Sequence, residues 1–68
     1  MELTVEEMIV KAINNPDKKF TNKAWLEEGD EGYIYWSTKE HHFLEEYDCN
    51  YDIDEFTPST GWLEYKGE

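Results

Sequence analysis

The sequence has no arginine, only one cysteine and no long apolar segment. Cys49 cannot form a disulfide within the chain, whereas small secreted domains commonly depend on about two to four disulfides. A helix that spans a membrane needs about 18 or more apolar residues in succession, and no stretch approaches that length. The first residues also lack the basic and apolar regions of a signal peptide. We therefore expect a cytoplasmic protein that does not contact membranes.

Basic residues are scarce: six lysines stand against 17 acidic residues, which gives a formal net charge of -11. Residues 1–26 are balanced, with four residues of each sign, whereas residues 27–68 hold thirteen acids and two lysines. Proteins that bind nucleic acid directly need basic contacts to phosphate, so this composition excludes that class and anionic membrane surfaces as well. A strongly negative protein is instead steered toward basic protein surfaces.

The length and the aromatic content together predict one small folded domain, residues 1–68. The apolar fraction of 38% is low for a globular chain, but three tryptophans, five tyrosines and three phenylalanines are present. Each aromatic side chain buries about 150–250 Å², so these residues supply a compact core despite the charge.

The first element is predicted to be a helix that starts after Thr4. Thr4 is a favourable N-cap and Glu7, three residues later, completes a capping box. The helix ends before Pro16, because the residue that precedes a proline avoids the helical region. Apolar residues recur with helical spacing at Val5, Met8, Ile9, Ala12 and Ile13.

The rest of the chain is predicted to form strands. Aromatic and β-branched residues alternate most clearly over residues 32–39, and weaker patterns cover residues 19–26, 42–47 and 62–66. Residues 27–32 and 48–50 have turn composition, and residues 52–56 are long enough for one helical turn. The fold class is therefore α+β, with one N-terminal helix packed on a small antiparallel sheet of three to four strands.

Metal sites receive little support from the sequence. Residues 48–54 carry oxygen side chains at alternate positions, as in a calcium loop, but Ile53 and Ser59 occupy the places of the required glycine and glutamate. The other candidate metal ligands are His41, His42 and Cys49. Their spacing fits none of the familiar zinc motifs. We expect no metal and no other cofactor.

Catalysis receives equally little support. Adjacent carboxylates such as Glu45 and Glu46 invite comparison with glycosidases, but a chain of this length has little room for the pocket that such chemistry needs. Acidic residues stand near Cys49 in the sequence, which does not favour a thiolate nucleophile. We expect no catalytic residues and no enzymatic activity.

The acidic residues of the second part of the chain are the strongest functional candidates. They are either a solubilising surface or an ordered array that imitates the phosphates of a nucleic acid and docks on a basic protein. Exposed aromatic residues beside them would act as binding hot spots. The predicted partner-binding residues are Glu27, Glu28, Asp30, Glu31, Tyr35, Trp36, Glu40, Glu45, Glu46, Asp48, Asp52, Asp54 and Glu55.

Five segments, taken in their order along the chain, resemble the small phage proteins of the Thoeris anti-defence type. The matching segments are residues 4–13, 18–25, 33–35, 52–56 and 61–65. The resemblance implies a phage protein that acts in the cytoplasm of a bacterial host, assembles into homo-oligomers and sequesters cyclic nucleotide signals of immunity. It also implies a link to anti-CRISPR activity. Because Asn22 stands where the family carries arginine, the phosphate contacts would fall to Lys18, Lys19 and Lys23.

Two functional hypotheses result. The first is a non-enzymatic phage-type protein for counter-defence or host takeover, an acidic nucleic-acid mimic that blocks the basic site of a host nuclease, repair enzyme or transcription factor. The alternative is an oligomeric sponge that binds cyclic nucleotides through the lysines of the first 26 residues.

Overall fold

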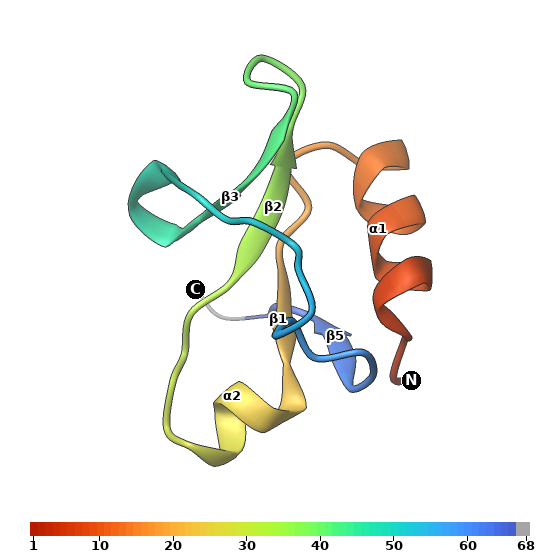
Figure 1. The fold of residues 1–68 in the computed structure, drawn as a ribbon, viewed down its shortest axis with the longest axis vertical. Helices are drawn as coiled ribbons and strands as arrows, with labels where there is room; N and C mark the ends of the chain where they lie inside the picture. The colour runs from red at the N-terminus through yellow and green to blue at the C-terminus, as the bar shows by residue number, and fades with distance from the viewer. Residues whose placement is uncertain (67–68) are drawn as a thin grey trace.

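The computed structural model describes residues 1–66 and contains two α-helices, one short 3-10 helix and five strands (Figure 1). The strands form one antiparallel sheet in the order β4-β3-β2-β1-β5. Along the chain the elements are α1 (Val5–Asn14), β1 (Phe20–Asn22), α2 (Lys23–Glu27), β2 (Ile34–Ser37), β3 (His42–Glu45), η1 (Glu46–Asp48), β4 (Cys49–Asn50) and β5 (Trp62–Glu64).

Helix α1 confirms the predicted capping box. The Thr4 hydroxyl accepts a hydrogen bond from the Glu7 amide, and the Thr4 amide donates to the Glu7 carboxylate at 2.9 Å. At the other end, the Asn15 amide donates to the carbonyl of Ala12 and closes the helix. Met8 and Ala12 are completely buried, so the apolar stripe of the helix faces the core as its spacing predicts.

The α+β prediction is confirmed, but the predicted count of three to four strands is wrong because the sheet has five. The additional strand is β4, in a segment that the sequence predicts to be a turn. Tyr47 and Asp48 adopt left-handed backbone conformations, with φ of 68° and 62°, and reverse the chain earlier than expected. Cys49 and Asn50 then pair with β3.

The segment predicted as the first strand, residues 19–26, divides into β1 and α2. Asn22 causes the division, because its side-chain oxygen accepts a hydrogen bond from the Ala24 amide at 2.9 Å and so caps α2. The helical turn predicted over residues 52–56 is also absent: the Thr57 amide donates to the Asp54 carbonyl, which closes a simple turn there.

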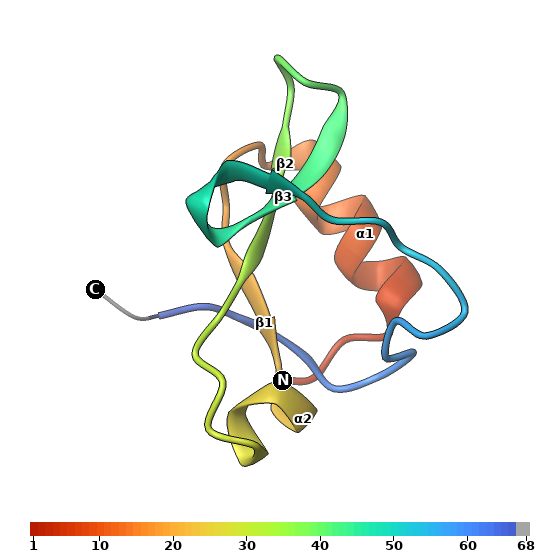
Figure 2. The same ribbon diagram turned by 60° about the vertical axis from the view of Figure 1, so that its left-hand side comes forward.

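The core lies between the sheet and two covering segments. Helix α1 packs on one face of the sheet, and the chain between β4 and β5 crosses the same face (Figures 1 and 2). A hydrogen bond of 2.9 Å from the Val5 amide to the Ser59 carbonyl joins the two segments. The buried centre consists of Met8, Ala12, Phe20, Ile34, Phe43 and Trp62.

The opposite face of the sheet carries a row of tyrosines. The ring of Tyr33 lies 4.8 Å from that of Tyr65 and 6.4 Å from that of Tyr35, measured between centroids. Along residues 33–36, Tyr33 and Tyr35 therefore alternate with Ile34 and Trp36, whose side chains pack on the core side. Among residues 1–66, neither helix has the length and apolar character needed to cross a membrane.

Candidate functional site

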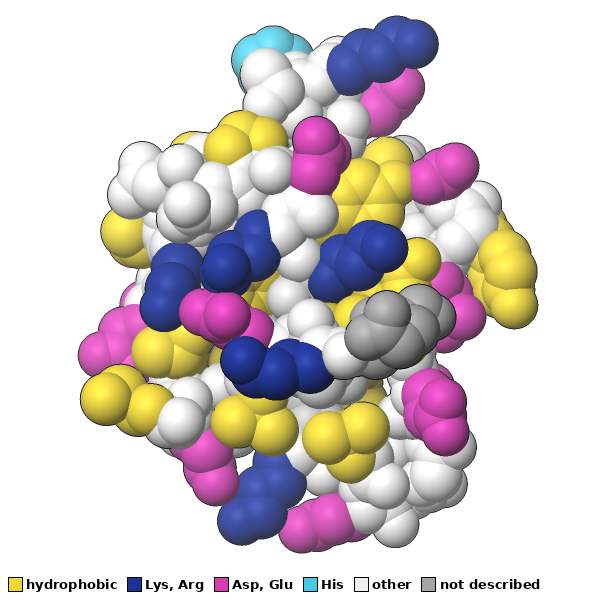
Figure 3. All heavy atoms as spheres, turned by 180° about the vertical axis from the view of Figure 1, so that it is seen from behind, with side chains coloured by type: hydrophobic (Ala, Val, Ile, Leu, Met, Phe, Trp, Pro, Cys, Tyr) yellow, Lys and Arg dark blue, Asp and Glu magenta, His cyan; other side chains and the backbone are white. Residues whose placement is uncertain are grey.

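Lysine side chains gather on the face shown in Figure 3, where acidic side chains lie among them. On strand β5, Glu64 holds two of the lysines: its carboxylate oxygens lie 3.1 Å from the Lys11 ammonium and 3.4 Å from that of Lys18. The hydrogen bond from Lys11 lowers the pKa of Glu64 below its usual value, and Lys18 acts in the same direction. One carboxylate is therefore shared by two ammonium groups on this part of the surface.

Two further lysines also have partners. Lys23 lies 3.4 Å from the carboxylate of Glu2, and the Lys19 ammonium lies 4.8 Å from the centroid of the Tyr33 ring. By contrast, within residues 1–66 no acid between positions 27 and 55 forms an ion pair with a lysine. The one contact there to a basic side chain joins Asp52 to His42 at 3.1 Å. Apart from Asp52, the acids of this region therefore have no cationic partner among residues 1–66.

The predicted partner-binding acids occupy four places in the fold. They do not form one continuous row, because the hairpin between β2 and β3 and helix α2 lie at opposite ends of the molecule (Figure 1). Glu27 ends α2 and Glu28, Asp30 and Glu31 follow it; Glu40 lies in the β2–β3 hairpin; Glu45, Glu46 and Asp48 lie where β3 turns into β4; Asp52, Asp54 and Glu55 lie between β4 and β5.

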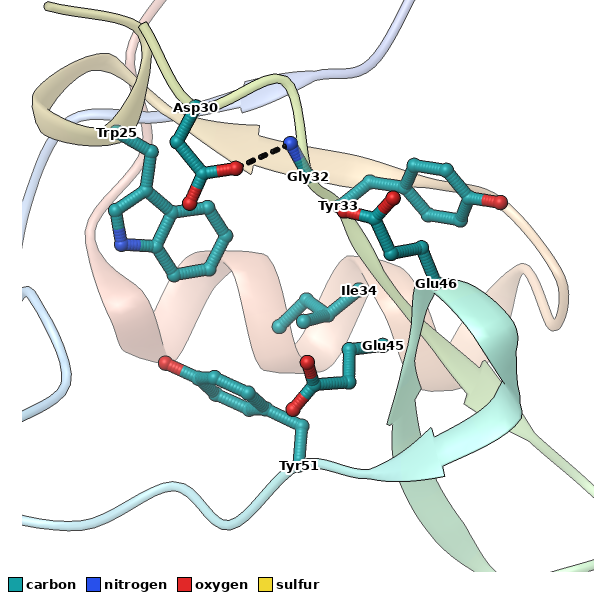
Figure 4. A pocket seen from close by; sticks show the side chains of 8 residues that line it. All are labelled: Trp25, Asp30, Gly32, Tyr33, Ile34, Glu45, Glu46 and Tyr51. Atoms are coloured by element: carbon teal, nitrogen blue, oxygen red, sulfur yellow. Dashed lines mark hydrogen bonds between the residues drawn. The ribbon is translucent and has the colours of Figure 1, made fainter. Parts of the chain in front are cut away.

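Three of these acids, Asp30, Glu45 and Glu46, converge on a pocket of about 280 Å³. Figure 4 shows their side chains around a space that is also bordered by aromatic rings. Glu45 and Glu46 are half-buried, although neither has a cationic partner among residues 1–66. The pocket is also lined by Trp25, Gly32, Tyr33, Ile34 and Tyr51.

Asp30 reaches the pocket because of the way in which α2 ends. Gly29 has a φ of +81°, and its amide donates to the Leu26 carbonyl while the Asp30 amide donates to the Trp25 carbonyl. This pair of bonds is a Schellman motif, for which glycine is the favoured residue. The Asp30 carboxylate then accepts a hydrogen bond of 2.8 Å from the Gly32 amide, which fixes the carboxylate at the rim (Figure 4).

Glycine is required at position 32 for a different reason, because two carboxylates lie very close to its backbone. A Cβ atom at this position would lie 2.6 Å from Oε1 of Glu46 and 3.0 Å from Oδ1 of Asp30. Any side chain at residue 32 would therefore displace the Glu46 carboxylate or occupy the pocket. The absence of a side chain lets two carboxylates from distant parts of the sequence approach the same space.

The aromatic walls are anchored in the core. The Trp25 ring contacts the ring of the fully buried Trp62 edge-to-face, with centroids 5.1 Å apart, and contacts Tyr51 in the same manner at 6.0 Å. The Tyr51 amide is bound to the Phe43 carbonyl at 2.9 Å. Burial raises the pKa of the Tyr51 phenol above its usual value. These contacts hold both rings in place without a ligand.

The predicted aromatic hot spots differ in exposure. Trp36 packs edge-to-face on Phe43 at 5.2 Å, on the core side of the sheet. Tyr35 is half-buried and its hydroxyl donates a hydrogen bond to Asp48, which raises the pKa of Tyr35 to about 12. Tyr47 is 88% exposed and stands between Glu46 and Asp48. The freely exposed aromatic rings in this region are therefore those of Tyr47 and of Phe56, which is 84% exposed and follows Glu55.

The candidate metal ligands do not converge on one site. His42 contacts Asp52, His41 is exposed in the β2–β3 hairpin with a φ of 54°, and Cys49 is an exposed free thiol. In the part of the chain that the structure describes, no three side chains of histidine, cysteine, aspartate or glutamate are grouped as a metal site would require.

Sequence reasoning identified the carboxylates of the pocket but not Trp25, Tyr51 or Gly32. Nothing local marks them, because the pocket forms only where the loop after α2 meets the end of β3. Comparison of the chain with models of protein families, with curated proteins and with solved structures found no match.

Proposed function

We propose that the chain is a non-enzymatic phage-type protein, used in counter-defence or host takeover, that binds the basic nucleic-acid-binding site of a host protein. The partner class is a bacterial nuclease, repair enzyme or transcription factor, and the acidic residues take the place of phosphates. Binding therefore excludes nucleic acid from the partner by direct competition.

The observation that supports this proposal is the unequal pairing of the two charge signs. Lys11, Lys18 and Lys23 are held by Glu64 and Glu2, outside the acidic region. The acids between residues 27 and 55 have no lysine partner in the described chain, although pairing some of them would relieve repulsion. Such charge costs stability in a domain whose core supplies only about 3–5 kcal/mol, and a basic partner would remove that cost on binding.

The arrangement also favours recognition over solubility alone. Half-buried carboxylates on strand β3 and η1 are held by backbone pairing, for example by the Glu46 amide, which donates to the Tyr33 carbonyl at 3.2 Å. An exposed ring, Tyr47, stands beside them. Carboxylates give fast, salt-sensitive association and register, whereas a buried aromatic ring gives much of the binding energy at protein interfaces.

The sponge hypothesis depends on Lys18, Lys19 and Lys23. Lys18 is paired with Glu64, Lys23 with Glu2, and Lys19 rests on the ring of Tyr33. Nucleotide binding would have to break these contacts, so no observation favours the sponge over docking on a basic protein. It is tested separately, by the rise in melting temperature that a cyclic nucleotide would cause in the absence of any protein partner.

The docking proposal is tested by capture and competition. The immobilised chain is exposed to bacterial lysate at low salt, and bound proteins are eluted either with about 0.3 M salt, where screening is strong, or with double-stranded DNA at low salt. We expect the same nucleic-acid-binding protein in both eluates. Proteins that salt releases but DNA does not would contradict competition for one basic site.

A matched pair of variants controls for net charge. Glu28→Gln with Glu55→Gln removes two exposed acids from the acidic region of residues 27–55, and Glu6→Gln with Asp17→Asn removes two exposed acids from outside that region. We expect the first variant to bind the purified partner several-fold more weakly than the second. Equal affinities would show that total charge, rather than an ordered surface, determines binding.

A further inference from the structure

We propose that the pocket between α2, β2 and the end of β3 receives the guanidinium group of an arginine side chain from the partner protein. This inference rests on the proposed function, since it names the chemistry that the acidic surface recognises. The pocket, which is open to solvent on one side, combines three carboxylates with aromatic walls around a space of about 280 Å³.

The size of the pocket limits its occupant. Sites for small-molecule ligands commonly enclose about 300–1,000 Å³, so this volume fits one side chain better than a nucleotide or a drug-sized molecule. Its carboxylates, from Asp30, Glu45 and Glu46, exclude phosphate and other anions on charge grounds. The occupant is therefore small and cationic.

The residues that line the pocket favour an organic cation over a metal ion. Figure 4 shows the carboxylates of Asp30 and Glu45 near the rings of Trp25 and Tyr51, and Glu46 on the other side, beside Tyr33. The carboxylates do not form a metal-binding group in the described chain. Aromatic faces next to carboxylates are instead the surroundings that an organic cation prefers, through cation–π contact and charged hydrogen bonds.

Arginine fits these walls better than lysine does. The guanidinium is planar, so it stacks against an aromatic ring while its N–H groups point outward to carboxylates in two directions. An ammonium is a compact and strongly hydrated charge that gains less from the rings. Trp25 is already fixed against Trp62, so little ordering of the wall is needed when the side chain enters.

Gly32 provides a test that leaves the charge unchanged. In Gly32→Ala the new Cβ atom would lie 2.6 Å from Oε1 of Glu46, the end of a flexible side chain, so the carboxylate moves and the backbone does not. Gly32 is not at a positive φ, so alanine is tolerated by the backbone. The matched charge variants are Glu45→Gln with Glu46→Gln inside the pocket, and Glu6→Gln with Asp17→Asn outside it.

The probes are three capped amino acids of similar length: N-acetyl-arginine methylamide, N-acetyl-lysine methylamide and the neutral analogue N-acetyl-citrulline methylamide. Each is titrated into the isotope-labelled chain, and binding is followed by NMR at the Trp25 indole and the Gly32 and Glu46 amides. We expect arginine to shift these signals in a saturable manner, lysine to bind several-fold more weakly, and citrulline to cause no saturable shift. Equal responses to arginine and citrulline, or shifts spread over all acidic residues, would overturn the inference.

The variants then separate this pocket from the wider proposal. We expect Gly32→Ala and the pocket pair to weaken arginine binding about tenfold relative to the control pair, with unchanged melting of Gly32→Ala as evidence of folding. If both bind arginine as the control does, the pocket assignment fails even where DNA-sensitive capture of a partner succeeds. If arginine binds here but no captured protein is displaced by DNA, the pocket assignment is upheld and the proposed function fails.

Discussion

Asn22 joins two parts of the fold through one side chain, and its replacement should be among the most destabilising changes outside the apolar core. The residue is 1% exposed. Its side-chain oxygen accepts from the Ala24 amide and its nitrogen donates to the Thr60 carbonyl, each at 2.9 Å. The first bond starts α2, which carries Trp25, and the second holds the chain as it enters β5.

The magnitude follows from these two bonds. Loss of an N-cap costs about 1 kcal/mol, and a carbonyl left without its partner costs about 1 kcal/mol or more. Asn22→Ala should therefore remove about 2 kcal/mol of the about 3–5 kcal/mol expected for a domain of this size. At about 4–8 °C per kcal/mol, the melting temperature should fall by about 8–16 °C.

Asn22→Ser separates the contributions of the two hydrogen bonds to stability. The serine hydroxyl still caps the Ala24 amide but is too short to donate to the Thr60 carbonyl, so we expect about half of the loss. Thermal unfolding followed by tryptophan fluorescence measures the melting temperature of all three proteins. A melting temperature within about 2 °C of the parent for Asn22→Ala, or a serine variant as unstable as the alanine variant, would refute this account of the side chain.

Three further predictions concern the turn after β3 and the lysine-rich face. Tyr47→Asn should leave the stability unchanged or raise it by about 0.5–1 kcal/mol in urea, because asparagine tolerates the left-handed conformation of this exposed residue. Asp48→Asn should lower the pKa of Tyr35 from about 12 toward 10.0, seen as tyrosinate absorbance at lower pH; an unchanged titration would count against the bond to Asp48. The pKa of Glu64 is lower in the folded chain than its unfolded value of 4.5. Its charged form therefore stabilises the fold above pH 4.5, and this stabilisation is lost as the pH falls below that value. Glu64→Gln should therefore lose less melting temperature than the parent over the same acidic range.

The elements that local signals determine are the ones that the sequence predicts well. Helix α1 is specified by residues within one turn of each other, from the Thr4 cap to the break before Pro16, and its bounds match the prediction. The pairing of β2 with β3 likewise joins neighbouring segments, with Tyr35 opposite Leu44 and Trp36 opposite Phe43. These interactions need little knowledge of the rest of the chain.

Helix α2 and strand β4 are harder to predict because competing signals occur together. Aromatic and apolar residues in 19–26 favour a strand, and only the cap at Asn22 and the glycine at position 29 indicate a helix of five residues. Strand β4 depends on two successive left-handed residues, of which one is Tyr47, a residue type that rarely adopts this conformation. Tertiary contacts outweigh local preference at both places.

The pocket could be predicted only in part for the same reason. Composition indicates that most acids lack a lysine partner, since only six lysines face 17 acids, but it does not single out Asp30, Glu45 and Glu46. Their meeting depends on the Schellman motif after α2 and on the bare backbone of Gly32, which bring together residues about fifteen positions apart. The order of charged residues along the chain does not show which of them lie close together in the folded structure.

The central claim is that a partner cannot hold this chain and nucleic acid at the same time. The most direct measurement is sedimentation of the purified complex during titration with labelled double-stranded DNA at constant low salt. The account predicts that DNA joins the partner only as the acidic chain leaves it, one for one, and that Glu28→Gln with Glu55→Gln lowers the DNA concentration required. A stable ternary species that contains the chain, its partner and DNA would contradict it.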